Sequence, residues 1–248
     1  MAQVVLPLVL GFVVAAGCGV HRSPSPPSQG EYEQVHGREL SEARRLHAEG
    51  KVEESAAILR RLVSDASWQV RARAISVIGE LRERSLLPEL HRALKDPMLF
   101  VRERVTRVLQ TVGDVSSLPP LREALSEPDA AVRGNIAEAL AKIGGAKELP
   151  ALSQVLQHDE DEGVRARTAF ALGEARLGAA VDPLVSALGD RSLSVRARAA
   201  EALGEIGDPR ARSALEKSAR SDPDSGVRTS AAAALKKLRA TGTGSESR

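Results

Sequence analysis

Cysteine and aromatic residues are scarce in this sequence of 248 residues. It holds one Cys, and its rings are limited to three Phe, one Trp and one Tyr. Sugar-binding clefts and surfaces that stack nucleic-acid bases normally use more aromatic side chains than this. The single cysteine excludes a disulfide framework and any cysteine-rich zinc site.

An excess of charge of either sign is also missing. The 35 Lys and Arg residues nearly balance the 33 Asp and Glu residues, and the formal net charge is +2. The chain therefore has no overall field that would attract nucleic acid or an anionic membrane. Hydrophobic residues make up 42% of the chain and are mostly Ala, Leu and Val, a mixture that suits helices. The composition predicts a helical protein with a sizeable core.

An apolar run at residues 4–16 opens the chain and ends in Ala15-Ala16-Gly17-Cys18. The run is too short for a stable membrane-spanning helix, which needs about 20 residues, but it fits the core of a signal peptide. Its end resembles the lipobox of bacterial lipoprotein signal peptides. The resemblance implies that residues 1–17 are a signal peptide, that the chain is cut after Gly17 and that a lipid is attached to Cys18.

The start of the chain departs from that pattern in two places. Met1-Ala2-Gln3 contains no Lys or Arg, and Ala15 stands where Leu is more common. An uncleaved N-terminal anchor, or a soluble chain with an apolar start, therefore stays open as an alternative. Within the lipoprotein family, Asp directly after the cysteine favours retention in the inner membrane. Gly19 at that position implies an anchor in the outer membrane rather than the inner one, on the periplasmic side of a bacterial envelope.

Pro, Ser and Gly dominate the next stretch, residues 18–38, as in Ser23-Pro24-Ser25-Pro26-Pro27-Ser28. Such a composition cannot bury enough apolar surface to fold. As a coil it would span about 25 Å, which is enough to hold a folded body away from a membrane. We therefore expect a lipidated Pro/Ser-rich linker here.

A repeat of 31 or 32 residues sets the organisation of the remaining chain. Its mark is a Val-Arg pair, with an acid five residues before the Val and a branched aliphatic residue eight residues after it. The pairs are Val70-Arg71, Val101-Arg102, Val132-Arg133, Val164-Arg165, Val195-Arg196 and Val227-Arg228. The acids are Asp65, Asp96, Glu127, Asp159, Asp190 and Asp222, and the aliphatic residues are Ile78, Leu109, Leu140, Leu172, Leu203 and Leu235.

Each unit of the repeat is expected to form a hairpin of two helices. After each Val-Arg pair, apolar and small residues recur at helical spacing, and a second apolar helix precedes the pair. This predicts six hairpins, at about 52–82, 86–113, 117–144, 147–176, 179–207 and 210–239. One further helix, at about 39–49, would cap the open N-terminal end. The hairpins and cap together occupy residues 39–240, and residues 241–248 are expected to be a flexible tail.

This pattern resembles the HEAT repeat, in particular the short, Ala-rich variety found in phycobilisome lyases. Pro88, Pro119, Pro150 and Pro183 lie at or near the family's proline position, which the first and last units lack. The resemblance implies an all-α fold, a right-handed α-solenoid. It also implies that the repeated acids and the arginines of the Val-Arg pairs bridge neighbouring turns as a structural ladder. A guanidinium and a carboxylate at one height in every repeat can pair through two hydrogen bonds.

Catalytic or metal-binding groups do not stand out in the sequence. The histidines are His21, His36, His47, His91 and His158, and none occupies a repeated position. The His-Glu pairs of the HEAT-type deoxyhypusine hydroxylases are missing. Residues 158–162, His-Asp-Glu-Asp-Glu, could hold a cation through oxygen atoms, but a solvated turn explains them better. We expect no enzyme activity, cofactor, metal or small-molecule substrate.

A column of arginines three residues after the repeated Val is the first candidate for binding a partner. It comprises Arg73, Arg104, Arg167 and Arg198, with Asn135 and Ser230 in the other two repeats. Alone it could follow a phosphate backbone. Glu80, Glu174 and Glu205 lie two helical turns further along the same face and offset it, which favours a protein partner over nucleic acid.

A few apolar side chains are the second candidate. Phe170 would lie on the same helix stripe, either exposed or as a core residue. Trp68, Leu99 and Phe100 lie in the turns of the first two repeats and would form one apolar patch, unless they pack inward. The sequence thus favours a non-enzymatic protein-binding scaffold tethered to the bacterial envelope. The alternatives are a HEAT-fold enzyme of the bilin-lyase type and, more remotely, a cytosolic nucleic-acid-binding protein.

Overall fold

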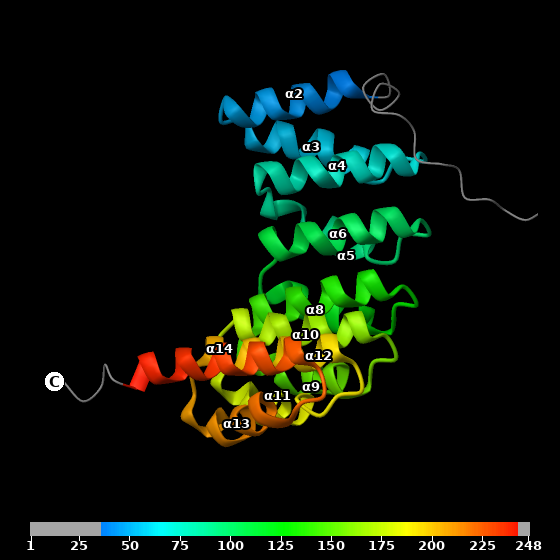
Figure 1. Cartoon of the computed structure of the whole chain (residues 1–248). Coiled ribbons are helices and arrows are strands. Elements are labelled where there is room, and N and C mark those ends of the chain that lie inside the picture. The colour runs from blue at the N-terminus through cyan, green and yellow to red at the C-terminus, as the bar shows by residue number, and fades with distance from the viewer. Residues whose placement is uncertain (1–35, 243–248) are drawn as a thin grey trace, which may run out of the picture.

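The computed structural model describes residues 36–242, with side-chain environments up to residue 239, and in this part of the chain every regular element is a helix. Pairs of antiparallel helices stack one upon another from the N-terminal end to the C-terminal end (Figure 1). The predicted signal peptide, Cys18, most of the linker and residues 243–248 lie outside the described residues.

The stack begins with helix α2 and continues as six hairpins. Helix α2 is Gly37–Ala48. The hairpins are α3 (Val52–Leu62) with α4 (Trp68–Leu81), α5 (Leu87–Ala93) with α6 (Leu99–Val112), α7 (Leu118–Glu123) with α8 (Ala130–Gly144), α9 (Leu149–His158) with α10 (Glu162–Glu174), α11 (Val181–Ala187) with α12 (Leu193–Ile206), and α13 (Arg212–Ser221) with α14 (Ser225–Gly242). The predicted all-α solenoid of six hairpins and one capping helix is confirmed.

Short 3-10 turns flank the first helices of the hairpins. They are η1 (Arg84–Leu86), η2 (Val115–Ser117), η3 (Ala124–Ser126), η4 (Gly145–Glu148), η5 (Gly178–Ala180) and η6 (Pro209–Ala211). Pro88, Pro119 and Pro150 lie in the first turns of α5, α7 and α9. A proline is tolerated there because the amides of the first turn have no partner within the helix.

The second helix of each hairpin starts two residues before the repeated Val, and the residue three before that Val lies at the N-cap position. Asp129, Asp161 and Asp224 each accept a hydrogen bond from the backbone N–H of that Val, at 3.0–3.1 Å. Their carboxylates satisfy one of the free amides at the start of the helix. Ser67 and Ser192 occupy the same position without a side-chain cap. The turn therefore does not depend on the cap in every repeat.

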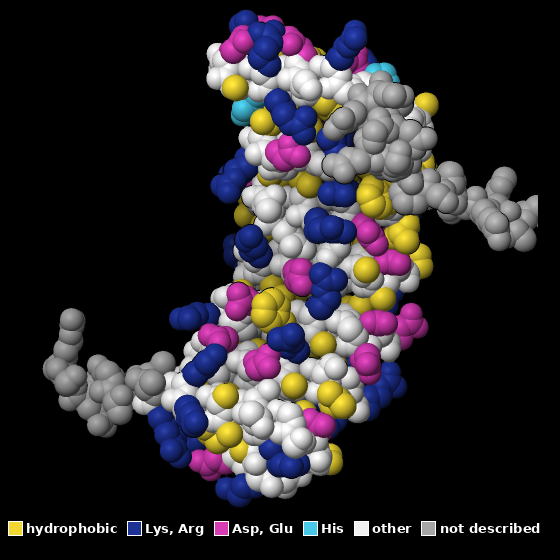
Figure 2. Space-filling view, turned by 45° about the horizontal axis from the view of Figure 1, so that its top comes forward, with side chains coloured by type: hydrophobic (Ala, Val, Ile, Leu, Met, Phe, Trp, Pro, Cys, Tyr) yellow, Lys and Arg dark blue, Asp and Glu magenta, His cyan; other side chains and the backbone are white. Residues whose placement is uncertain are grey.

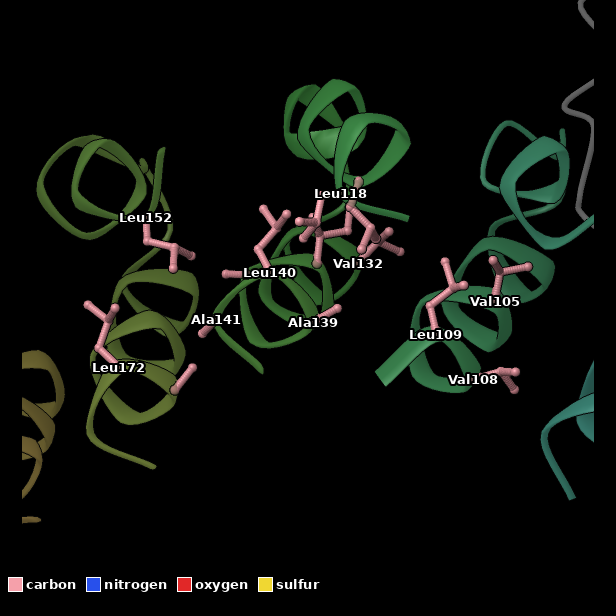
Figure 3. Packing of buried hydrophobic residues seen from close by; sticks show 14 of the residues in the cluster. Val105, Val108, Leu109, Leu118, Val132, Ala139, Leu140, Ala141, Leu152 and Leu172 are labelled. Carbon is pink, nitrogen blue, oxygen red and sulfur yellow. The ribbon is translucent and has the colours of Figure 1, made fainter. Parts of the chain in front are cut away.

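The core lies between the two layers of helices. The aliphatic residue eight after the repeated Val is fully buried in the first five repeats, as Leu109, Leu140 and Leu172 illustrate. Leu140 points towards Leu118, and Leu172 towards Leu152, so that each pair joins a second helix to its first helix (Figure 3). The equivalent Leu235 in the last repeat is only partly buried.

Small residues bring successive second helices close together. A Cβ atom at Gly173 would lie 2.6 Å from Cα of Ala202 on α12, and one at Gly204 would lie 2.8 Å from Cα of Ala234 on α14. The second helices contact one another along their length, whereas neighbouring first helices such as α9 and α11 meet at few residues. The closer layer is the inner one, so the second helices line the concave side of the stack (Figure 1).

None of the helices between residues 36 and 242 is both long enough and apolar enough to cross a membrane.

Candidate functional site

A ladder of ion pairs runs along the turns that lead into the second helices. In five repeats the arginine of the Val-Arg pair donates from Nε and Nη2 to both oxygens of the repeated acid in the following repeat. The pairs are Arg71–Asp96, Arg102–Glu127, Arg133–Asp159, Arg165–Asp190 and Arg196–Asp222, with donor–acceptor distances of 2.6–3.1 Å. Paired hydrogen bonds of this kind fix both distance and orientation.

Each ladder arginine also holds its own turn. Arg165 donates from Nη1 to the backbone oxygens of Asp159 and Glu160, at 2.8 and 3.3 Å. The acids act in the same way, because Asp190 accepts from the backbone N–H of Ser192 at 2.8 Å. One guanidinium thus joins two successive turns, and the ladder sets the spacing of the repeats.

The two ends of the ladder differ from its middle. No ladder arginine of an earlier repeat pairs with Asp65 in the described part of the chain, and Nε2 of His36 lies 3.7 Å from its carboxylate. Arg228 makes the two backbone bonds, to Asp222 and Pro223, but no acid of a further repeat follows it in the part of the chain described.

The ladder lowers the pKa of its buried acids. Burial by itself raises the pKa of Asp159 and Asp190, but hydrogen bonds from Arg133 and Arg165 and from backbone amides outweigh it, so both values lie below the ordinary one. The hydrogen bonds from Arg196 lower the pKa of Asp222. The acids thus favour the folded state while they are ionised.

Acidification is therefore expected to unfold the chain. A group with a depressed pKa contributes stability that is complete above its unfolded value, about 3.9 for Asp, and that is lost as the pH falls through the folded value. The free energy of unfolding, measured by urea titration and circular dichroism, should change little above about pH 5 and fall steeply below pH 4. Asp159→Asn should lower stability at pH 7 and make the acid slope shallower, whereas Glu123→Gln, at an exposed acid, should change neither. An unchanged slope in Asp159→Asn would contradict the assignment.

The predicted column of arginines lies on the second helices, and two of its members contact the preceding repeat in the same way. In both, the residue three after the repeated Val packs against the residue six after the Val of the preceding repeat. Arg167 donates from Nε to Glu138 at 3.0 Å, and the guanidinium of Arg198 lies 5.6 Å from the ring centre of Phe170. Arg104 departs from this pattern, because its guanidinium lies 5.3 Å from the ring centre of Phe100 on its own helix.

The acids that offset the column are not those that the sequence indicated. Glu80 binds Arg44 of the capping helix at 2.7 Å, and Glu205 pairs with Lys237. Two arginines of the column have other acid partners: Arg167 pairs with Glu138 at 3.0 Å, and Arg198 pairs with Glu201 at 2.8 Å. Lys and Arg side chains are interspersed with Asp and Glu over the visible face of the stack (Figure 2).

Phe170 is exposed to solvent over 43% of its surface and is not a core residue. It lines an open hollow of about 470 Å³ together with Gln110, Glu138, Lys142 and Glu174. Gln110, which the sequence did not single out, donates to Glu138 at 3.0 Å. The hollow thus combines the exposed ring with two acidic side chains, Glu138 and Glu174.

The apolar patch of the first two repeats is only partly at the surface. The rings of Trp68 and Phe100 meet edge to face with their centres 5.5 Å apart. Trp68 is only 8% exposed and belongs to the core, so the interpretation of this residue as a partner-binding side chain is wrong. Its indole packs inward across the join between the two repeats. Leu99 is 38% exposed, and Phe100 is half-buried.

The acidic turn at residues 158–162 has structural tasks. Asp159 accepts the ladder arginine Arg133, and Asp161 caps α10. Among the described residues, no group of three His, Cys, Asp or Glu side chains is placed to hold a metal ion.

The family model for HEAT repeats matches three overlapping stretches of the chain, residues 55–141, 100–171 and 149–236. No curated protein matches the chain in sequence. An archaeal HEAT-like repeats protein from Thermococcus onnurineus NA1 is similar in structure, with 14% identity and a TM-score of 0.54, covering 88% of this chain and 99% of the other.

Two further solved structures are similar. YIBA_ECOLI has 23% identity and a TM-score of 0.52, over 74% of this chain and 68% of the other. The complex of CpcE and CpcF of phycocyanin lyase from Nostoc sp. PCC7120 has 22% identity and a TM-score of 0.48, over 95% and 93%. At these levels of sequence identity, the similarity shows only that the folds are alike. With the repeats, their ladder and a family match over more than half of its length, the chain belongs to the HEAT-repeat family.

Proposed function

We propose that this chain is a non-enzymatic scaffold that binds a protein partner on its concave face and is held at the bacterial envelope by a lipid on Cys18. The observation that carries the binding role is the inner face itself. It presents arginines, carboxylates and the exposed ring of Phe170 along successive second helices, in shallow hollows rather than one enclosed cavity. A repetitive surface of this kind suits an extended partner.

The envelope location is supported by the sequence alone. The apolar run that ends in Ala15-Ala16-Gly17-Cys18 has the length and end of a lipoprotein signal peptide, and a Pro/Ser-rich segment follows it. A single acyl chain gives only marginal membrane binding, so the proposal requires more than one chain on the mature N-terminus.

The location is tested by intact mass and detergent partitioning after expression in a bacterium. We expect a chain that begins at Cys18, with added acyl mass, in the detergent phase. Cys18→Ser should be unprocessed and should lose both the added mass and the partitioning. A full-length, unmodified, water-soluble wild-type product would overturn the envelope location and would leave the enzyme and nucleic-acid alternatives open.

The binding role is tested by placing a photo-crosslinking amino acid at Phe170 in cells. The matched position is Val115, which is 74% exposed on η2 and lies outside the second helices. We expect one or a few discrete crosslinked products from position 170 and none from position 115. Equal products at both positions, or none at position 170, would contradict a specific concave binding face.

A further inference from the structure

The N-terminal part of the concave face differs in charge from the rest. Arg167 and Arg198 each have an acid partner, whereas no carboxylate of residues 36–242 lies within ion-pair distance of Arg73 or Arg104. Both side chains are only partly exposed. Two half-buried guanidinium groups without a counter-charge favour an anionic ligand.

The surroundings of these two arginines form a small pocket. Ala72, Arg73, Ser76, Glu80, Phe100 and Arg104 line a hollow of about 200 Å³ between α4 and α6. The pocket thus combines two cations, a hydroxyl group and one ring, on neighbouring repeats.

Two contacts leave Arg73 and Arg104 able to bind a ligand. Glu80, the one acid of the pocket wall, is bound through Oε2 by both Nε and Nη2 of Arg44, at 2.9 and 2.7 Å. This hydrogen bonding occupies Glu80 with the capping helix rather than with Arg73. The guanidinium of Arg104 lies 5.3 Å from the ring centre of Phe100. The ring supports one face of the guanidinium and leaves its N–H edges free to donate.

The spacing of the two arginines selects the form of the ligand. They occupy equivalent positions on successive second helices, and packed helices lie about 8–10 Å apart. Gly79 of α4 faces Val108 of α6 at close approach, so this join is a tight one. A polyproline II segment advances about 9.3 Å in one turn of three residues, and residues three apart lie on the same side of it. A segment with acidic residues three positions apart would therefore place one carboxylate beside each of the two arginines.

We propose that the pocket of Arg73, Ser76, Phe100 and Arg104 binds an extended acidic segment of the protein partner, with two carboxylates three residues apart. The proposal rests on the scaffold role and adds the chemistry of the ligand. Each carboxylate accepts hydrogen bonds from one guanidinium. The hydroxyl of Ser76 lines the pocket but already donates to the backbone oxygen of Ala72 at 2.9 Å. A segment that already adopts polyproline II has little conformational freedom, so it loses little conformational entropy on binding.

The column is too short for a nucleic acid. Asn135, which follows Arg104 in the column, is buried and bonded to Thr106 and Arg167. Each strand of a DNA duplex carries a phosphate about every 3.4 Å along the axis, and would bring several more charges to a face that also holds Glu103, Glu138 and Glu201. Two isolated carboxylates match the two free cations better.

The test uses the full-length protein in detergent and two fluorescent peptides of equal composition. In one, two Glu residues are three positions apart among prolines, and in the other they are two apart. Fluorescence anisotropy at low salt should show about tenfold tighter binding of the first peptide, because only it engages both arginines. Equal affinity for the two peptides would overturn the proposal.

Variants with matched charge complete the test. Arg73→Gln with Arg104→Gln should weaken binding of the first peptide at least tenfold. Arg92→Gln with Arg122→Gln removes the same charge from exposed positions on the first helices, α5 and α7, and should leave binding unchanged. Equal loss in both double variants would indicate unspecific attraction. Tighter binding of a single-stranded oligonucleotide that also depends on Arg73 and Arg104 would favour nucleic acid instead.

The two proposals fail in different ways. Crosslinks at Phe170 without any binding of the spaced peptide would retain the scaffold and refute this pocket. Peptide binding without crosslinks at Phe170 would retain the pocket as an acidic-peptide site and refute the wider concave binding face.

Discussion

Replacing Arg165 with alanine is expected to lower the free energy of unfolding by about 3–5 kcal/mol, the cost of breaking a buried ion pair by removing one partner. The side chain of Arg165 is 3% exposed and that of Asp190 is 12% exposed. Without the guanidinium, the carboxylate loses two hydrogen bonds of 2.9 Å, and the backbone oxygens of Asp159 and Glu160 lose their donor. The charge that remains cannot be hydrated well at this depth.

The last ladder arginine provides the matched control. Arg228 makes the same pair of backbone hydrogen bonds as Arg165 but has no following acid among the described residues. Arg228→Ala should therefore cost about 1 kcal/mol, the net value of ordinary hydrogen bonds. The difference between the two variants in urea unfolding isolates the carboxylate pair. Equal losses would mean that the ladder holds single turns and does not join repeats. The loss of stability in Arg165→Lys should lie between those of Arg165→Ala and Arg228→Ala, because an ammonium group cannot pair with a carboxylate through two parallel hydrogen bonds.

The ladder could be predicted from the sequence because it follows the period of the repeat. An acid and an arginine at fixed positions in every unit must recur at one height in a stack, whatever the exact rotation of the helices. The period does not fix the order of the pairing, and the structure shows that each paired arginine binds the acid of the next repeat. The contacts between the second helices did not follow, because they depend on how far one helix is shifted along its neighbour.

The contacts of Trp68 and Arg44 could not be predicted from the repeat pattern. Trp68 and Leu99 occupy the same position of their repeats, yet the first is buried and the second is 38% exposed. The larger ring reaches Phe100 of the following repeat, and that contact depends on the identity of a side chain in another unit. Arg44 lies on the capping helix, outside the repeats, so no period indicated that it would bind Glu80 and leave Arg73 without an acid.

Replacing Gly173 with valine is expected to cost about 3 kcal/mol, at the upper end of the range for overpacking a dense interface. A Cβ atom there would lie 2.6 Å from both Cα and Cβ of Ala202, and a backbone atom cannot turn aside as a side chain can. Helices α10 and α12 must separate. Gly178→Val is the control, since nothing lies within 4 Å of a Cβ at Gly178 and its φ is not positive; it should change stability by less than about 0.5 kcal/mol.

The same position separates the cost of packing from helix propensity. Gly173→Ala gains about 1 kcal/mol of helix propensity, so a net loss in that variant would show that the clash exceeds this gain. Adding Ala202→Gly should restore part of the loss, because it removes the Cβ of Ala202 but leaves its Cα in place. If α10 and α12 separate, the inner layer widens and the stack bends less, which small-angle X-ray scattering should detect as a greater maximum dimension. A stable Gly173→Val variant with unchanged dimensions would refute the view that close second helices cause the curve on which the concave face depends.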